Sequence, residues 1–255
     1  MKTIFITGAS SGIGASLARH YAQQGYQLGL VARRGNMLTQ MAETLSPKPA
    51  IYICDVRDTT ALKTAAADFT LRFGVPDIVI ANAGISRGTL TEIEDDLQAF
   101  QEIFDINVMG MVKTFQPFIE PMRAAKKGTL VGIASVAGFR GIPGGGAYSA
   151  SKAATIKYCE ALRVELRGSG ISVVTICPGY IRTPMTAVNR FKMPFLIDVD
   201  DAVVRFARAI DAKTSFTVIP WTMGIAARLL RIAPNFLYDA VFTRMPRKPR
   251  GTQQP

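Results

Sequence analysis

Short apolar runs alternate with longer segments of helical periodicity along most of this chain of 255 residues. Repeated strand–helix–strand units need crossover connections, and these produce a parallel sheet with helices on both faces. We therefore predict one α/β domain, built on a doubly wound parallel sheet of seven strands. The predicted strands are Lys2–Thr7, Gln27–Ala32, Ile51–Cys54, Ile78–Ala81, Leu130–Ala134, Ile171–Ile176 and Phe216–Ile219.

The segments between these runs carry apolar residues at helical spacing, so they predict the helices that cover the sheet. Residues 1–220 would form the sheet-containing unit, with a lid near residues 184–197. Residues 221–255 would form a helical extension and a basic tail appended to the same domain. The predicted helices of the main unit are Gly12–Gln24, Asn36–Leu45, Thr59–Phe73, Leu97–Ala125, Ala147–Arg167 and Asp198–Ala212.

A glycine-rich turn joins the first predicted strand to the first predicted helix. Small residues let the backbone approach a pyrophosphate, and the N-terminus of the helix offers free N–H groups and a positive dipole end. A glycine triplet alone is weak evidence, but its place between a strand and a helix predicts a dinucleotide site of the Rossmann type. The candidate binding residues in this turn are Gly8, Ser10, Ser11, Gly12, Ile13 and Gly14.

The end of the second strand indicates which dinucleotide would fit. A carboxylate there would bind the ribose hydroxyls of NAD, but this chain has Arg33 and Arg34. Two guanidinium groups attract a 2′-phosphate, which arginine binds with a forked geometry. The pair favours NADP(H) over NAD(H), although two solvated arginines at the start of a helix would give the same sequence.

Tyr148 and Lys152 stand four residues apart on a predicted helix, so their side chains share one face. A phenol ionises at about pH 10, and a nearby ammonium lowers that pKa. Such a pair can transfer a proton without a histidine, although the same spacing also occurs on ordinary helix surfaces. Ser135 ends the fifth predicted strand, where its hydroxyl could hold a substrate oxygen.

These features together resemble the short-chain dehydrogenases/reductases. The resemblance implies that Tyr148 is the catalytic acid and base, that Lys152 lowers its pKa and binds the nicotinamide ribose, and that Ser135 positions the substrate. It assigns Asn107 to a water-linked proton relay and expects a local helix distortion there. An asparagine has poor propensity in mid-helix, which agrees with such a role. Further cofactor contacts of the family correspond here to Asp55, Val56, Asn82, Ala83, Gly84, Pro178, Gly179, Ile181 and Thr183.

The resemblance predicts an NADP(H)-dependent oxidoreductase that moves a hydride to a carbonyl carbon or from an alcohol carbon. Some NADP-using members carry a basic residue where this chain has Ser11, so the preference rests on the two arginines. Asp55 would also suit an ordinary turn or helix cap. The alternative function is an NADPH-binding sensor or scaffold without turnover. Members of the family usually form homodimers or homotetramers through the helices that hold Asn107 and Tyr148.

The substrate is less constrained than the cofactor. Residues 185–197 are rich in methionine, phenylalanine and leucine, which suits a lipophilic carbonyl compound, although core packing explains them equally well. Arg182, Arg190 and Lys192 could meet an anionic group or merely face water.

The basic charge is concentrated at the C-terminal end. The formal net charge is +11, and residues 214–255 hold six Arg or Lys residues against one acid, Asp239. A basic amphipathic stretch can lie on an anionic membrane. We favour instead a helical hairpin, over the substrate mouth or between subunits, that ends in a solvated basic tail. The tail lacks interleaved aromatic residues, so nucleic-acid binding is not expected.

The remaining residues of potential chemical interest point to ordinary structural roles. The single histidine, His20, lies within the first predicted helix, away from the other candidates. Cys54, Cys159 and Cys177 have neither close spacing nor a cluster of histidines and acids, so no metal site or disulfide is expected. With no signal peptide and no long apolar run, we expect a cytoplasmic protein, with peripheral membrane contact through residues 221–255 left open.

Overall fold

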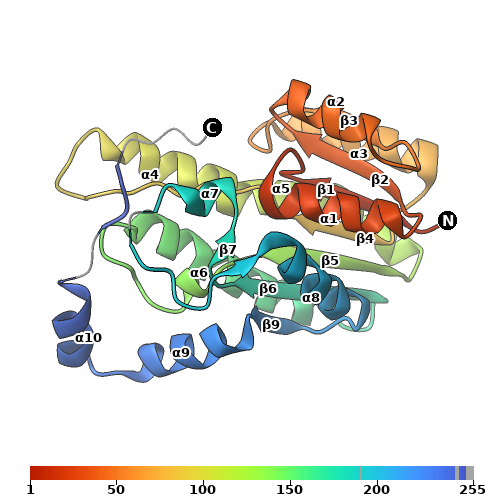
Figure 1. Cartoon of the computed structure of the whole chain (residues 1–255). Coiled ribbons are helices and arrows are strands. Elements are labelled where there is room, and N and C mark those ends of the chain that lie inside the picture. Colours follow the sequence, from red (N-terminus) through yellow and green to blue (C-terminus); the bar gives the residue numbers. More distant parts are fainter. Residues whose placement is uncertain (190, 245–246, 251–255) are drawn as a thin grey trace.

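A parallel sheet of seven strands runs through the molecule, in the order β3-β2-β1-β4-β5-β6-β9 (Figure 1). The structure is a computed structural model that describes residues 1–189, 191–244 and 247–250. The strand order reverses between β1 and β4, which opens a crevice at the carboxyl ends of these strands. The predicted fold class is confirmed. The strands are β1 (Thr3–Thr7), β2 (Gln27–Ala32), β3 (Ala50–Ile53), β4 (Ile78–Ala81), β5 (Gly128–Ile133), β6 (Ile171–Pro178) and β9 (Phe216–Ile219).

Helices cover both faces of the sheet, and β1 shows why. Its side chains alternate between the faces: Ile4 and Ile6 belong to one buried cluster, and Phe5 belongs to the other. All three side chains are inaccessible to solvent. The first cluster includes residues of α1 (Gly12–Gln23), α2 (Gly35–Glu43) and α8 (Val199–Asp211); the second includes residues of α3 (Thr59–Phe73), α4 (Asp96–Phe104), α5 (Gly110–Ala124) and α6 (Gly146–Glu165).

The region predicted as one long helix, Leu97–Ala125, is interrupted in its middle. A π-helical turn, Asp105–Met109, separates α4 from α5 and contains Asn107. The helix distortion expected at Asn107 is therefore present. Single π-helical turns within α-helices are frequent at functional sites, and here the turn directs a polar side chain into the buried interior.

Two small features lie beyond the predicted elements. Strands β7 (Ile181–Arg182) and β8 (Ile197–Asp198) pair in parallel and bracket the short helix α7 (Pro184–Ala187). A 3-10 turn, Val136–Gly138, follows β5. The predicted lid thus has both of its ends tied together by a two-stranded sheet. Arg190 of that lid lies outside the described residues.

The predicted C-terminal extension forms two helices, α9 (Trp221–Ile232) and α10 (Asn235–Phe242). Helix α9 packs on the edge strand β9 at Gly224, where an added Cβ would come 3.1 Å from the Cβ of Val218. The described part of the tail, residues 247–250, is not simply solvated, because Lys248 and Arg250 bond to residues of the main unit. Residues 245–246 and 251–255 of the predicted tail lie outside the described residues. Within the described ranges, none of the helices is both long and apolar enough to cross a bilayer.

Candidate active site

A cleft of about 450 Å³ lies at the carboxyl ends of β1, β2, β3 and β4. It is lined by thirteen of the predicted cofactor-binding residues: Gly8, Ser10, Ser11, Gly12, Ile13, Arg33, Arg34, Asp55, Val56, Asn82, Ala83, Gly84 and Thr183. The predicted residues Gly14, Tyr148, Lys152, Pro178, Gly179 and Ile181 are not part of this lining. Sequence reasoning overlooked other lining residues, namely Ala32, Cys54, Ile85, Arg87, Ile106, Pro184 and Met185.

The glycine turn is held tightly against the end of β4. Gly8 has a φ of +69°, and an added Cβ there would come 2.7 Å from the Cα of Ala83. At Gly14 an added Cβ would come 2.5 Å from Nδ2 of Asn82. That amide donates hydrogen bonds to the carbonyl oxygens of Thr7 and Gly8, both at 3.1 Å. A backbone cradle without side chains at these positions is what a pyrophosphate needs, so the residues fit a dinucleotide. Gly14 serves the packing of the turn rather than the lining.

Two arginines stand at the end of the cleft beside β2. Arg34 reaches back over the glycine turn, and its Nη2 donates to the hydroxyls of Ser11 at 2.5 Å and Ser10 at 3.1 Å. Arg33 places Nη1 3.5 Å from a carboxylate oxygen of Asp55, and its side chain is 52% exposed. The serine at position 11, where some family members have a basic residue, is thus covered by the guanidinium of Arg34.

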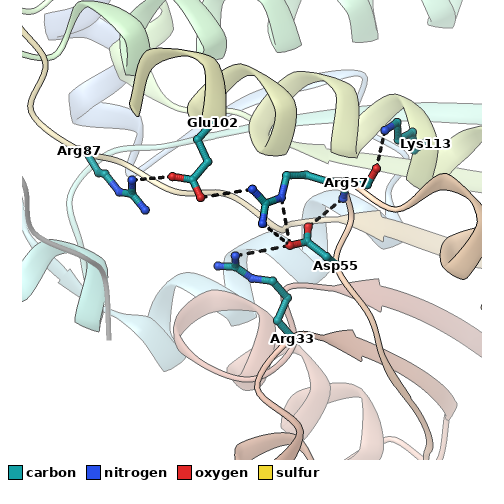
Figure 2. A network of polar contacts seen from close by, with 6 residues as sticks. All are labelled: Arg33, Asp55, Arg57, Arg87, Glu102 and Lys113. Carbon is teal, nitrogen blue, oxygen red and sulfur yellow. Dashed lines mark hydrogen bonds and ion pairs between the residues drawn. The ribbon is translucent and has the colours of Figure 1, made fainter. Parts of the chain in front are cut away.

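Arg33 also belongs to a chain of ion pairs along the cleft (Figure 2). Arg57 bonds Asp55 at 2.7 Å and Glu102 at 3.4 Å, and Glu102 pairs with Arg87 at 2.5 Å. Partial burial pushes the pKa of Asp55 upward, but the hydrogen bonds from Arg57 and the charge of Arg33 outweigh it and lower that pKa. Asp55 is therefore ionised and engaged by arginines. Nothing in the spacing of Arg57, Arg87 and Glu102 along the chain marks them as neighbours.

Asn107 joins three parts of the structure through its buried amide. Its Oδ1 accepts a hydrogen bond from the backbone N–H of Ile85 at 2.8 Å. Its Nδ2 donates to the carbonyl oxygen of Ile85 and to the hydroxyl of Ser151, both at 3.0 Å. The Ser151 hydroxyl in turn donates to the carbonyl oxygen of Tyr148 at 2.8 Å. The loop after β4, the π-helical turn and α6 are thereby fixed relative to one another.

The other three candidate catalytic residues meet at the start of α6 and the end of β5. Lys152 donates from Nζ to the carbonyl oxygen of Ile133 at 2.9 Å, and the same Nζ lies 5.8 Å from the ring centroid of Tyr148. The Ser135 side chain lies near enough to the Tyr148 phenol to lower the pKa of that phenol. Ser135 itself accepts from the backbone N–H of Ala137 at 3.1 Å.

Burial governs the protonation of this group. It raises the pKa of Tyr148, against the lowering effect of the hydrogen bond with Ser135. Burial also lowers the pKa of Lys152 to about 8. The sequence predicted a phenol made more acidic by its lysine neighbour. In the structure the loss of solvation is the larger effect, because both groups lie in the interior.

The loop after β4 brings the catalytic group and the cleft together. An added Cβ at Gly84 would come 3.1 Å from Oδ1 of Asn107 and 3.6 Å from Nζ of Lys152. Gly84 also lines the dinucleotide cleft. The four candidate catalytic residues therefore gather directly beside the place where a dinucleotide would lie.

The sheet order and the glycine cradle, with the candidate catalytic residues beside it, are typical of α/β oxidoreductases of the nucleotide-binding class. More narrowly, the chain belongs to the short-chain dehydrogenase/reductase family, since residues 2–193 match the family model described as short chain dehydrogenase.

Individual relatives agree with this assignment. The chain is 37% identical over 252 residues to a Myxococcus xanthus protein described as an uncharacterized oxidoreductase, covering 96% of this chain and 97% of that one. It is 32% identical over 245 residues to a ketoacyl reductase of Nostoc sp., covering 91% and 84%. A solved short-chain dehydrogenase/reductase of Burkholderia phymatum in complex with NAD superposes with a TM-score of 0.82 over 98% of both chains. At 23% identity that likeness shows the fold.

Proposed function

We propose that this protein is an NADP(H)-dependent oxidoreductase that reduces a carbonyl group, or oxidises the matching alcohol, with Tyr148 as acid and base. The observation that carries the proposal is the meeting of Asn107, Ser135, Tyr148 and Lys152 beside the glycine-lined cleft. Tyr148 and Lys152 lie on α6, whereas Asn107 lies in the π-helical turn and Ser135 follows β5, so three separate parts of the chain bring polar groups to one interior site.

Each residue has a role that follows from its contacts. Ser135 and Tyr148 hold the carbonyl oxygen between their hydroxyls, and Tyr148 gives up its proton to that oxygen. The raised pKa keeps the phenol protonated at neutral pH, which is the form that reduction requires. Lys152, held by the carbonyl oxygen of Ile133, binds the nicotinamide ribose, and Asn107 supports the resupply of protons. When bound, the reduced nicotinamide supplies the hydride.

Arg33 and Arg34 support a preference for NADP(H), with NAD(H) as the weaker cofactor. Both line the cleft at the end of β2, where the adenosine 2′-phosphate would lie, and arginine binds phosphate in a bidentate manner. Pro178, Gly179, Ile181 and Thr183 would hold the nicotinamide end. The solved Burkholderia phymatum relative contains NAD, so the preference rests on the two arginines rather than on the fold.

The apolar side chains in and beside the lid favour a substrate with an apolar body. Met185 lines the cleft, the rings of Tyr180 and Phe191 meet edge to face with centroids 6.2 Å apart, and Phe195 is 53% exposed. Apolar side chains at a cleft mouth are suited to a lipophilic carbonyl compound. The Nostoc relative is described as a ketoacyl reductase, which is in keeping with such a substrate.

We further propose a cytoplasmic homodimer or homotetramer in which α9 and α10 touch an anionic membrane surface peripherally. Trp221, Ile232 and Phe236 are each more than two-thirds exposed, and Arg228 and Arg231 lie on the same helical arm, which is formed by α9 and α10. Exposed apolar groups beside arginines suit an anionic bilayer. Flotation with anionic vesicles should require residues 221–244. If the arm instead buries these residues against a second copy, flotation will fail and deletion of residues 221–244 will dissociate the oligomer in light scattering.

A screen of NADPH oxidation tests the central proposal. Aldehydes, ketosteroids, quinones and 3-oxoacyl thioesters are offered in turn, with NADH as the comparison cofactor. We expect turnover with at least one class and faster turnover with NADPH. Binding of NADPH without turnover of any class would favour the alternative, a sensor or scaffold, and failure to bind either cofactor would contradict both.

A further inference from the structure

The last described residues of the chain form a strap, residues 247–250, across the mouth of the catalytic group. At one end Arg247 packs on Gly144, where an added Cβ would come 2.9 Å from the Cβ of Arg247. At the other end Arg250 pairs with Asp96 of α4, through contacts of 2.8 and 3.2 Å. Between them the carbonyl oxygen of Pro249 accepts from the N–H of Gly88 at 3.1 Å. Figure 1 shows this blue segment running from the side of α10 toward α4.

The helical arm formed by α9 and α10, which precedes the strap in the sequence, is bound to the loop before α6. Arg140, in the loop before α6, donates to the carbonyl oxygens of Leu230 and Ala233 and, at 2.9 Å, to Oδ1 of Asn235. Its guanidinium also lies 4.0 Å from the ring centroid of Tyr238. The arm is thus anchored to the loop that leads directly into Tyr148.

The strap inserts one cation next to the catalytic tyrosine. Nζ of Lys248 donates to the hydroxyl of Ser86 at 2.6 Å and lies 5.8 Å from the ring centroid of Tyr148. The ammonium of Lys152 lies at the same distance from that ring. Ser86 is buried and follows the Gly84–Ile85 stretch that lines the cleft. Two ammonium groups, one from the middle of the sequence and one from near its C-terminal end, therefore lie beside one phenol.

The ammonium group of Lys248 has no counter-ion within the described part of the protein. Its contacts there are a hydroxyl and an aromatic ring, and no described carboxylate pairs with it. Asp96, a carboxylate on the neighbouring α4, already forms an ion pair with Arg250. Burial lowers the pKa of Lys248 to about 8, which reflects the cost of removing an ammonium from water without an anion beside it. An anionic ligand would remove that cost.

Resting on the function proposed above, we propose that Lys248 and Ser86 form an anion-binding subsite, so that the substrate is a carbonyl compound with an oxyanion near its carbonyl group. A carboxylate, sulfonate or phosphate would each satisfy this chemistry. The apolar body of the substrate then lies toward the lid and its charged end lies under the strap. Lys248 is a specificity-determining residue in this scheme, and the proton still comes from Tyr148.

The test compares carbonyl compounds that differ only in charge. Succinic semialdehyde and acetoacetate are each measured against their methyl esters in NADPH-dependent reduction by the full-length protein. The variants are Lys248→Met, which removes the charge, and Lys248→Arg, which keeps it. Lys63→Met, on the exposed side of α3, is the matched control for loss of one positive charge. Pro249 and Arg250 keep their contacts in both strap variants.

We expect the wild type to prefer the anionic member of a pair, and Lys248→Met to lose about 10- to 100-fold in kcat/KM for it, because a charge-assisted hydrogen bond is removed. With the methyl esters, Lys248→Met should stay within about 3-fold of the wild type, because an ester offers no anion to bind. Lys63→Met and Lys248→Arg should stay within about 3-fold of the wild type on both members of a pair, since each keeps the charge at position 248. Equal losses on the acid and its ester, or no preference in the wild type, would overturn the subsite.

Calorimetric titration with succinate and dimethyl succinate, with and without NADPH, separates this inference from the proposed function. If the wild type turns over none of the compounds, the proposed function fails for these classes, yet succinate binding that disappears in Lys248→Met would still support the subsite. Succinate binding that is equal in the wild type and Lys248→Met would overturn it.

Discussion

Replacing Asn107 with leucine, a residue of similar size, tests whether this amide holds the active site together. The side chain is 1% exposed and makes three hydrogen bonds of 2.8 to 3.0 Å. Leucine would leave the N–H and the carbonyl of Ile85 buried without partners, at a cost of about 1–3 kcal/mol each. Ser151 would keep its bond to the carbonyl oxygen of Tyr148. The expected loss is therefore about 2–6 kcal/mol, a large part of the ~5–15 kcal/mol typical of a folded domain.

Urea unfolding at fixed protein concentration measures this loss, and NADPH turnover at low urea measures its effect on the site. Ser151→Ala is the matched control, because it removes one hydrogen-bond partner and should cost only about 1 kcal/mol. Turnover of Asn107→Leu should fall together with stability, since Ile85 lines the cleft. A loss no larger than that of Ser151→Ala would show that the amide does not fix the loop after β4.

Three further changes follow from the same contacts. Arg34→Ala should raise the KM for NADPH about 10- to 100-fold and leave the KM for NADH nearly unchanged, because a charge-assisted contact to phosphate is lost; an equal change for both cofactors would contradict the assignment. Gly14→Ala should abolish cofactor binding or soluble expression, because the new methyl would lie 2.5 Å from Nδ2 of Asn82; wild-type binding by fluorescence titration would refute this. Burial lowers the pKa of both Lys152 and Lys248 to about 8, so both ammonium charges are lost as the pH rises above that value. kcat/KM should fall there for a neutral substrate and more steeply for an anionic one, and Lys248→Arg should remove the difference. Parallel pH profiles for the neutral and the anionic substrate would contradict the role of the Lys248 charge.

Local sequence patterns predicted the fold because parallel strands buried on both faces leave a strong apolar signal. Strands β2, β4 and β9 begin and end at the predicted residues; β1 and β6 differ by one or two residues at one end, and β3 and β5 differ by one or two residues at both ends. The two-residue strands β7 and β8 are too short to leave any periodicity. The break between α4 and α5 has no local signal either, apart from an asparagine at a position of poor helical propensity.

The site could be predicted where its residues follow strands, as in the glycine turn and the arginines after β2. Ion pairs such as that of Arg57 with Glu102 depend on tertiary distances that spacing does not reveal. The same holds for Lys248, which lies 162 positions from its partner Ser86. The sequence suggested a solvated tail, because a run of basic residues near the end of a chain gives no sign of what it contacts. The direction of the pKa shift of Tyr148 could not be predicted from the sequence either, because it depends on burial.

Tyr148→Phe is the most direct test of the account, because it removes one hydroxyl and keeps the ring on which Lys152 and Lys248 pack. Turnover and NADPH affinity are measured on the same preparation, with the most active substrate of the screen. We predict that kcat falls about 100- to 10,000-fold, the usual contribution of general acid catalysis, while the Kd for NADPH stays within about 3-fold, since the hydroxyl lies outside the dinucleotide cleft. A variant that binds NADPH and turns over at the wild-type rate would contradict the assignment of Tyr148 as the proton donor.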